Sequence, residues 1–205
     1  MSRRAILAGV ALLALALSAA EAARTTLRAT RPGAPPLTLR ATSSQEHWTI
    51  SVLEGGIESQ RIEVQSDLPD MLPRLADTNG DGAVDLWVPV IGGNANTAWD
   101  LWLMQPDQAR FRRAGEIGGL GFSRDSAGRL VSVGRNGCCA VSYTFHTFDA
   151  EGTLREAFSI ERQVDDLGRG TCEPVPIAVT PPPAAVRATC GLRPGQLPGR
   201  PLPLP

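Results

Sequence analysis

The chain contains the acidic stretch Asp77-Thr78-Asn79-Gly80-Asp81-Gly82-Ala83-Val84-Asp85, which continues directly into Leu86-Trp87-Val88-Pro89-Val90. Acidic and amide side chains recur at alternate positions of the first part, and Gly82 permits a sharp reversal of the chain. The second part is rich in residues that favour strands, and Pro89 excludes a helix there. The stretch therefore predicts a tight acidic loop that opens into a β-strand.

The spacing of oxygen-bearing side chains in this loop is typical of a calcium site. Ca²⁺ takes about six to eight oxygen ligands, and side chains at the first, third and fifth positions of such a loop can converge on one point. The seventh position adds a backbone carbonyl. Mg²⁺ is the weaker candidate because it retains water and demands octahedral geometry, and a turn that binds nothing is the other alternative. The expected ligands are Asp77, Asn79, Asp81, the carbonyl of Ala83, and Asp85 as the closing acid.

The loop differs from an EF-hand in the residues on its C-terminal side. An EF-hand carries a bidentate Glu at its twelfth position, and Val88 stands there in this chain. On both sides of the loop, short segments are dense in strand-forming residues or alternate apolar and polar side chains. These segments are residues 47–53, 61–65, 86–91, 99–105, 130–133, 141–148 and 153–161. Gly55-Gly56 predicts a hairpin between the first two, and the whole pattern predicts an all-β fold.

The two ends of the chain differ in composition from its middle. Residues 1–22 have two arginines, an apolar run and the small residues Ala20 and Ala22, which is typical of a cleaved signal peptide. The alternative, a transmembrane anchor, requires a longer apolar run. We expect a disordered leader at 23–36, an all-β calcium-binding domain at 37–172 and a Pro-rich, polyproline-like or disordered tail at 173–205. Export to the periplasm or the medium follows from the signal peptide.

Composition and charge restrict the classes of function. The 205 residues carry a net charge of −1, with 42% hydrophobic and 20% charged residues. This balance excludes a membrane bundle, a strongly disordered chain and a nucleic-acid binder that relies on a basic field. The 21 glycines and 17 prolines predict many turns. We expect a mature protein with no nucleic-acid partner and no membrane span.

Four cysteines, Cys138, Cys139, Cys172 and Cys190, predict two disulfide bonds in an oxidising compartment. Neighbours on a strand point to opposite faces, so Cys138 and Cys139 can reach different partners. We favour one bridge from this pair to Cys172 and one to Cys190, with the assignment open. Pairing of the two adjacent cysteines is strained, and a metal–thiolate site with His146 is a further alternative.

The loop and its following strand resemble the calcium loops of FG-GAP (VCBS-type) repeats, which occur in β-propellers. Later features are similar to a narrower group, the exported propeller-like calcium proteins of Gram-negative bacteria. These features are Trp99-Asp100-Leu101-Trp102-Leu103, Phe111, and Gly137-Cys138-Cys139 leading into the run that ends at Phe148. The group includes a periplasmic immunity protein that inhibits a lysozyme-like toxin delivered by a type IV secretion system. The resemblance covers about residues 68–161.

The resemblance implies a small propeller-like or irregular antiparallel β-sheet domain with one calcium loop. A blade takes about 40 residues, so the mature chain is too short for a complete multi-bladed propeller. The implied function is that of a non-catalytic inhibitor or immunity protein against a peptidoglycan hydrolase. The alternative is a structural or adhesive calcium-binding module with no enzyme target.

No residue pattern supports catalysis. The chain has two histidines, and we find neither a nucleophile paired with a base nor a metalloprotease motif. Asp165-Asp166 favours a solvated turn. If the protein inhibits a hydrolase, a rigid loop must enter the glycan cleft of the enzyme, and we expect residues 91–97 to do so. The expected partner-binding residues are Gly92, Gly93, Asn94, Asn96 and Trp99. Trp87, Trp99 and Trp102 lie in the segments beside the loop, and core packing is at least an equal alternative to a binding role for two of them.

Overall fold

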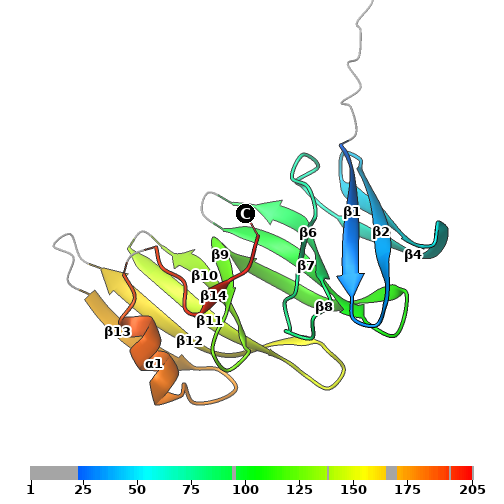
Figure 1. Ribbon diagram of the computed structural model, residues 1–205. Helices are drawn as coiled ribbons and strands as arrows, with labels where there is room; N and C mark the ends of the chain where they lie inside the picture. Colours follow the sequence, from blue (N-terminus) through cyan, green and yellow to red (C-terminus); the bar gives the residue numbers. More distant parts are fainter. Residues whose placement is uncertain (1–22, 94–95, 138, 165–169, 194, 205) are drawn as a thin grey trace, which may run out of the picture.

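Strands in three antiparallel sheets make up most of the computed structural model, which describes residues 23–93, 96–137, 139–164, 170–193 and 195–204 (Figure 1). The sheets lie in an open row, and within the described residues no sheet closes into a barrel. The expected all-β class with irregular antiparallel sheets is therefore confirmed.

Each sheet is built on four consecutive strands that are also neighbours in space. Sheet A contains β1 (Arg24–Arg31), β2 (Ala34–Ser43), β3 (His47–Glu54) and β4 (Ile57–Gln65). Sheet B contains β5 (Arg74–Ala76), β6 (Asp85–Gly92), β7 (Thr97–Gln105) and β8 (Arg110–Gly119). Sheet C contains β9 (Gly121–Arg124), β10 (Leu130–Asn136), β11 (Ala140–Phe148) and β12 (Leu154–Val164), extended by β13 (Gly170–Pro176) and β14 (Arg200–Pro201).

The segments selected by their sequence pattern lie in strands almost throughout. The predicted hairpin is β3–β4, and its turn places Gly55 and Gly56 at φ 58° and 91°. These angles lie in the left-handed region that favours glycine. Local alternation was sufficient for β3 and β4 because each of them buries one face against sheet B.

The expected disordered leader is wrong for the described residues from 23 onward. β1 and β2 occupy this segment and pair along their length. In β1, Leu27 and Ala29 pack into the core while Arg28 between them faces solvent. The guanidinium of Arg31, which is buried, donates to the carboxylate of Glu54. The leader therefore supplies β1 and the first residues of β2, which belong to the first four-stranded sheet.

The expected disordered tail is also wrong in most of its length. β13 places Pro174 and Pro176 on the edge of sheet C, where a missing N–H is tolerated. The helix α1 (Pro183–Cys190) begins with proline in its first turn, a position that suits proline's fixed φ. Beyond α1 the chain runs back along β9 to sheet B, where Leu202 and Leu204 are partly buried (Figure 1). No helix in the described part of the chain is long and apolar enough to cross a membrane.

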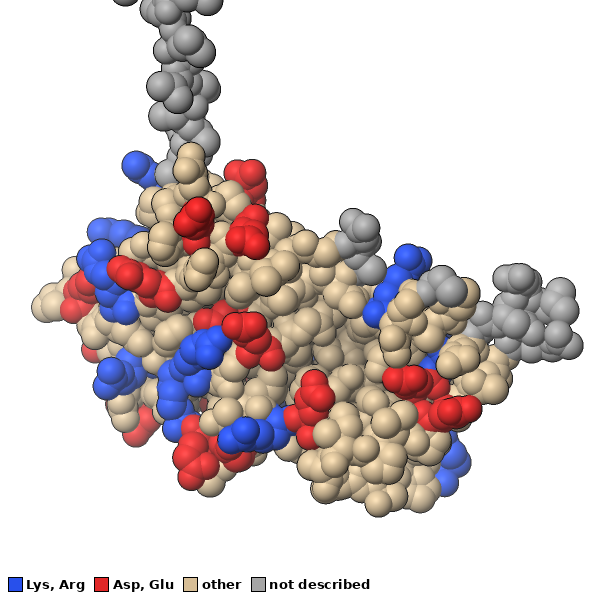
Figure 2. Space-filling view, turned by 180° about the vertical axis from the view of Figure 1, so that it is seen from behind, with Lys and Arg blue, Asp and Glu red and all other residues tan. Residues whose placement is uncertain are grey.

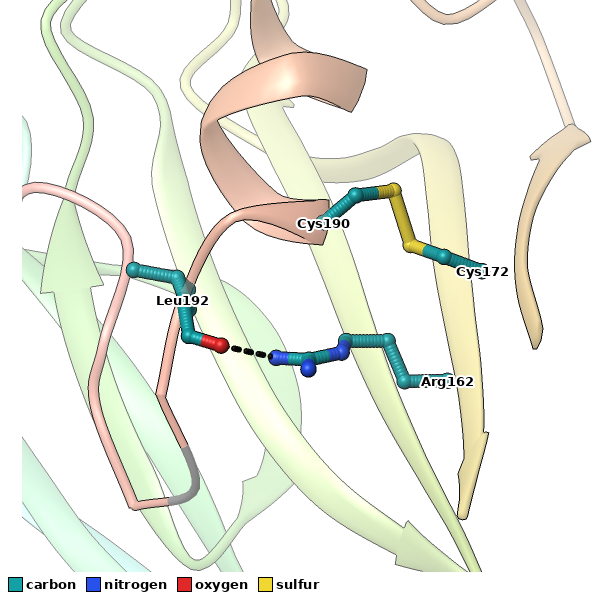
Figure 3. The surroundings of a disulfide bond; sticks show 4 residues. All are labelled: Arg162, Cys172, Cys190 and Leu192. Atoms are coloured by element: carbon teal, nitrogen blue, oxygen red, sulfur yellow. Dashed lines mark hydrogen bonds between the residues drawn. A yellow bond between two sulfur atoms is a disulfide. The ribbon is translucent and has the colours of Figure 1, made fainter. Parts of the chain in front are cut away.

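The disulfide pairing differs from the expected one. Cys172 of β13 is bonded to Cys190 at the end of α1, 18 residues later (Figure 3). Cys139 is also disulfide-bonded, and Cys138 lies outside the described residues. The expected bridges from the adjacent cysteines to Cys172 and Cys190 are therefore wrong, because α1 returns over the edge strand that carries Cys172. The observed bridge attaches the tail to the domain.

Three apolar clusters hold the sheets together. One fills the space between sheets A and B and includes Trp48, Leu86 and Phe111. A second joins sheets B and C and includes Trp87, Trp99 and Phe122. The third lies between sheet C and α1 and includes Tyr143, Phe145 and Phe158. Each internal face is thus covered by the next element along the row.

Candidate functional site

The acidic loop connects β5 to β6 and sits at the junction of sheets A and B. Ala76 ends β5 and Asp85 begins β6. Within the loop, Ala83 is fully buried in the cluster between the two sheets, and the N–H of Val84 donates to the carbonyl of Thr30 in β1 at 3.0 Å. The loop is therefore held by both sheets, although its acidic tip remains accessible.

The side chains at the predicted ligand positions fold back over the loop backbone. Asp77 Oδ1 accepts the N–H of Gly80 at 2.7 Å, Asn79 Oδ1 accepts that of Asp81 at 3.1 Å, and Asp81 Oδ1 accepts that of Ala83 at 2.8 Å. Gly80 and Gly82 have φ angles of 83° and 86°, which the reversal requires. Because carboxylate and amide oxygens each accept more than one hydrogen bond, these side chains keep further acceptor capacity.

Asp85 has different surroundings from those expected of a closing ligand. Its carboxylate is buried, and its two oxygens accept the N–H groups of Thr78 at 2.8 Å and Met104 at 2.9 Å. Burial raises the pKa of this carboxyl to about 7, although both N–H groups favour the charged form. Within the described part of the chain, no three His, Cys, Asp or Glu side chains are gathered as a metal-holding group. Asp85 instead ties the loop to β7.

The remaining four positions carry oxygen donors of the type that Ca²⁺ takes. Asp77 and Asp81 provide two carboxylates, Asn79 an amide oxygen and Ala83 a backbone carbonyl, all of them hard oxygen donors of the kind that Ca²⁺ takes. Such a set leaves several coordination positions for water. With Asp85 bonded to Thr78 and Met104, the loop offers two accessible carboxylates where the sequence predicted three.

Arg124 of β9 is a neighbour of the loop that sequence reasoning missed. Its Nη1 lies 3.6 Å from Asp77 Oδ1. A Cβ atom on Gly80 would collide with the same guanidinium. This positive charge offsets part of the repulsion between the loop acids. No local pattern could reveal the contact, because sheet C places Arg124 there from 47 positions farther along the chain.

The expected partner-binding loop is only partly exposed. Gly92 and Gly93 are exposed, and Asn94 lies outside the described residues. The expectation is wrong for Trp99, whose side chain is buried against Trp87 in the cluster between sheets B and C. The side chain of Asn96 is bonded to the backbone of Arg135: its Oδ1 accepts the Arg135 N–H at 3.0 Å, and its Nδ2 donates to the Arg135 carbonyl at 3.2 Å. Of the three tryptophans that flank the acidic loop in sequence, Trp87 and Trp99 are in the core, while Trp102 is half-buried.

A groove of about 570 Å³ lies between sheets A and B, and Ile91 at the start of the expected partner-binding loop lines it. Arg113 in the groove pairs with Asp100 at 2.7 Å and with Glu116 at 3.0 Å. Burial raises the pKa of Asp100, and the charge of Arg113 opposes that rise. The other charged lining residues are acidic, namely Glu63 and Asp67, and Ile91 at the rim is 53% exposed. The groove therefore offers negative charge beside an exposed apolar side chain.

Charge on the back of the molecule is mixed. Figure 2 shows acidic and basic side chains interspersed over this face, with no large area of one sign. The face therefore lacks the basic field that a nucleic-acid binder would use. Comparison of the chain with protein-family models, curated proteins and solved structures found no match to any of them.

Proposed function

We propose that this chain is an exported calcium-binding β protein that acts by binding, not by catalysis, and that it inhibits a peptidoglycan hydrolase. The observation that carries the proposal is the acidic loop, in which two carboxylates and an amide are folded over a tight turn. The Cys172–Cys190 bond supports an oxidising compartment. The signal-peptide pattern of residues 1–22, which lie outside the described residues, agrees with export.

Asp77, Asn79, Asp81 and the carbonyl of Ala83 would hold the ion. A bound Ca²⁺ would supply positive charge that relieves repulsion between the two carboxylates. Asp85 holds the loop in position by accepting the N–H groups of Thr78 and Met104. Since Ala83 and Val84 hold the loop against both sheets, the ion would stiffen this part of the junction between sheets A and B.

Calcium is expected to raise the melting temperature of the mature protein by about 5–10 °C at a hundredfold excess over Kd. A ligand that binds only the folded state adds about 2.7 kcal/mol at this excess, and 1 kcal/mol corresponds to about 2–4 °C for a domain of this size. Magnesium should produce a much smaller shift. Thermal unfolding in calcium, in magnesium and in chelator measures the effect.

Asp81→Ala is expected to abolish this response, while Asp107→Ala is the matched control. Asp107 is an exposed acid in the turn between β7 and β8, far from the loop in sequence. Calcium shifts of equal size in both variants would contradict the site. Absence of any shift, with no calcium found by elemental analysis of the protein as purified, would leave the loop as an ordinary turn.

The groove between sheets A and B is the surface that we assign to the partner. Glu63, Asp67 and Glu116 exceed the single positive charge of Arg113, and Ile91 projects at the rim. Acidic rims favour association with a basic protein surface, and an exposed apolar side chain adds a contact that excludes water. The partner surface is therefore expected to be cationic around an apolar pocket.

Purified mature protein is expected to slow the hydrolysis of peptidoglycan by a lysozyme-type enzyme, and Ile91→Asp is expected to weaken that inhibition at least tenfold. The substitution replaces the apolar contact at the rim by a charge, whose burial against the partner is costly. A turbidity assay of cell-wall lysis measures the rate, with Ile57→Asp as the control at an exposed position on sheet A. If no hydrolase is inhibited while calcium still binds, the structural or adhesive alternative replaces this proposal.

A further inference from the structure

A second concave site lies on the face of sheet C beside α1, away from the acidic loop and the groove. Its volume is about 370 Å³, within the range of about 300–1,000 Å³ that small-molecule pockets occupy. Strands β10, β11 and β12 form its floor, and the chain that returns after α1 forms one wall. Nothing in the proposed calcium or hydrolase function uses this pocket.

The body of the pocket is apolar. Val133 and Tyr143 are paired across β10 and β11 and are both buried, so they form the floor. Leu197 closes the wall on the tail side, and Leu120, which is 52% exposed, stands at the mouth. An apolar surface of this kind favours the burial of a hydrocarbon or ring from water.

Two arginines lie at one end of this apolar surface. Val141 of β11 pairs with Arg135 on one side and with Arg162 on the other, so the three side chains share the face that carries Tyr143. Of the described residues that line the pocket, none is acidic. The guanidinium of Arg135 has no ion pair or hydrogen bond within the described part of the chain. The pocket therefore combines apolar walls with uncompensated positive charge.

Arg162 is held in position by the structure around the disulfide. Its Nη1 donates to the carbonyl of Leu192 at 2.8 Å, and it faces Cys172 across β12 and β13 (Figure 3). The bond from Cys172 to Cys190 fixes the end of α1, from which Leu192 follows. One nitrogen is thereby engaged, and the other donors of the guanidinium remain for a ligand.

We propose that this pocket binds a small monocarboxylate with an apolar body, such as a medium-chain fatty acid. The carboxylate accepts hydrogen bonds from Arg135 and Arg162, a pairing that the planar guanidinium favours. The hydrocarbon lies over Val133 and Tyr143 toward Leu120. The two arginines favour a negatively charged head group. The apolar walls favour a ligand that also has a hydrocarbon portion over a bare inorganic anion.

Octanoate is the probe that tests the site, with octanol and octylamine as the neutral and cationic matches. Isothermal titration of the mature protein should show saturable octanoate binding, at least tenfold tighter than that of either match. Arg135→Gln and Arg162→Gln should each weaken octanoate binding about tenfold or more, because each removes a charged hydrogen-bond donor. Arg28→Gln, at an exposed position on β1, should leave it unchanged.

Two further results decide the proposal even if Arg162→Gln fails to fold. Arg135 is exposed and its guanidinium has no hydrogen bond or ion pair to lose within the described residues, so its variant remains informative. Val141→Trp, which fills the pocket between the arginines, should abolish binding of octanoate. Equal binding of octanol and octanoate, octanoate binding that survives both Arg135→Gln and Val141→Trp, or the absence of saturable binding would each overturn the assignment.

Discussion

Replacing Asp85 with alanine is expected to lower the free energy of unfolding by about 2–6 kcal/mol in the presence of chelator. The carboxylate satisfies the N–H groups of Thr78 and Met104 in a buried setting. Each N–H left without a partner costs about 1–3 kcal/mol. Urea unfolding followed by tryptophan fluorescence measures the effect, since Trp87 and Trp99 lie in the adjoining core.

Two variants separate this structural role from that of a metal ligand. Asp85→Asn keeps one acceptor oxygen, so its loss of stability should lie between those of wild type and Asp85→Ala. Asp81→Ala removes an exposed carboxylate and should cost at most about 1 kcal/mol in chelator while it abolishes the calcium response. If Asp85→Ala matches the wild type in chelator and loses only calcium binding, Asp85 is a ligand after all.

The acidic loop illustrates how far a motif can be interpreted before the fold is known. The spacing from Asp77 to Asp81 determines local hydrogen bonds, because each oxygen reaches a backbone N–H two or three residues later. The role of Asp85 depends on Met104, which lies in another strand 19 residues away. The same sequence spacing is compatible with a ligand and with a buried structural acid, so only the tertiary contact separates them.

The ends of the chain show a second limit of sequence reasoning. Strands such as β3 were predictable because alternation records which face is buried, and β6 and β7 because they are dense in strand-forming residues. Proline-rich segments give no such pattern, although Pro174 and Pro176 are compatible with an edge strand such as β13. Whether a segment is at the edge of a sheet depends on its neighbours. The pairing of Cys172 with Cys190 follows from the same edge position, since α1 packs beside it.

His146 provides the second large prediction: acidification from pH 7 to pH 5 should destabilise wild type by about 2 kcal/mol more than it destabilises His146→Gln. The buried ring pairs across β10 and β11 with Leu130, which belongs to the cluster between sheets B and C. Its Nε2 is 3.0 Å from Ser132 Oγ, and its Nδ1 has no hydrogen-bond partner among the described residues. Burial without a charged partner lowers the pKa of His146 to about 4.

The sign of this effect depends on the protons bound in each state. The unfolded histidine, with an ordinary pKa of about 6.5, binds a proton between pH 6.5 and 4 while the folded one does not, so stability is lost as the pH falls through this window. Asp85 titrates in the same window with the opposite sign, because burial raises its pKa to about 7. The difference between wild type and His146→Gln cancels that contribution, and urea unfolding at pH 7, 6 and 5 measures it. Parallel pH profiles for the two proteins would show that the buried ring takes up its proton without cost.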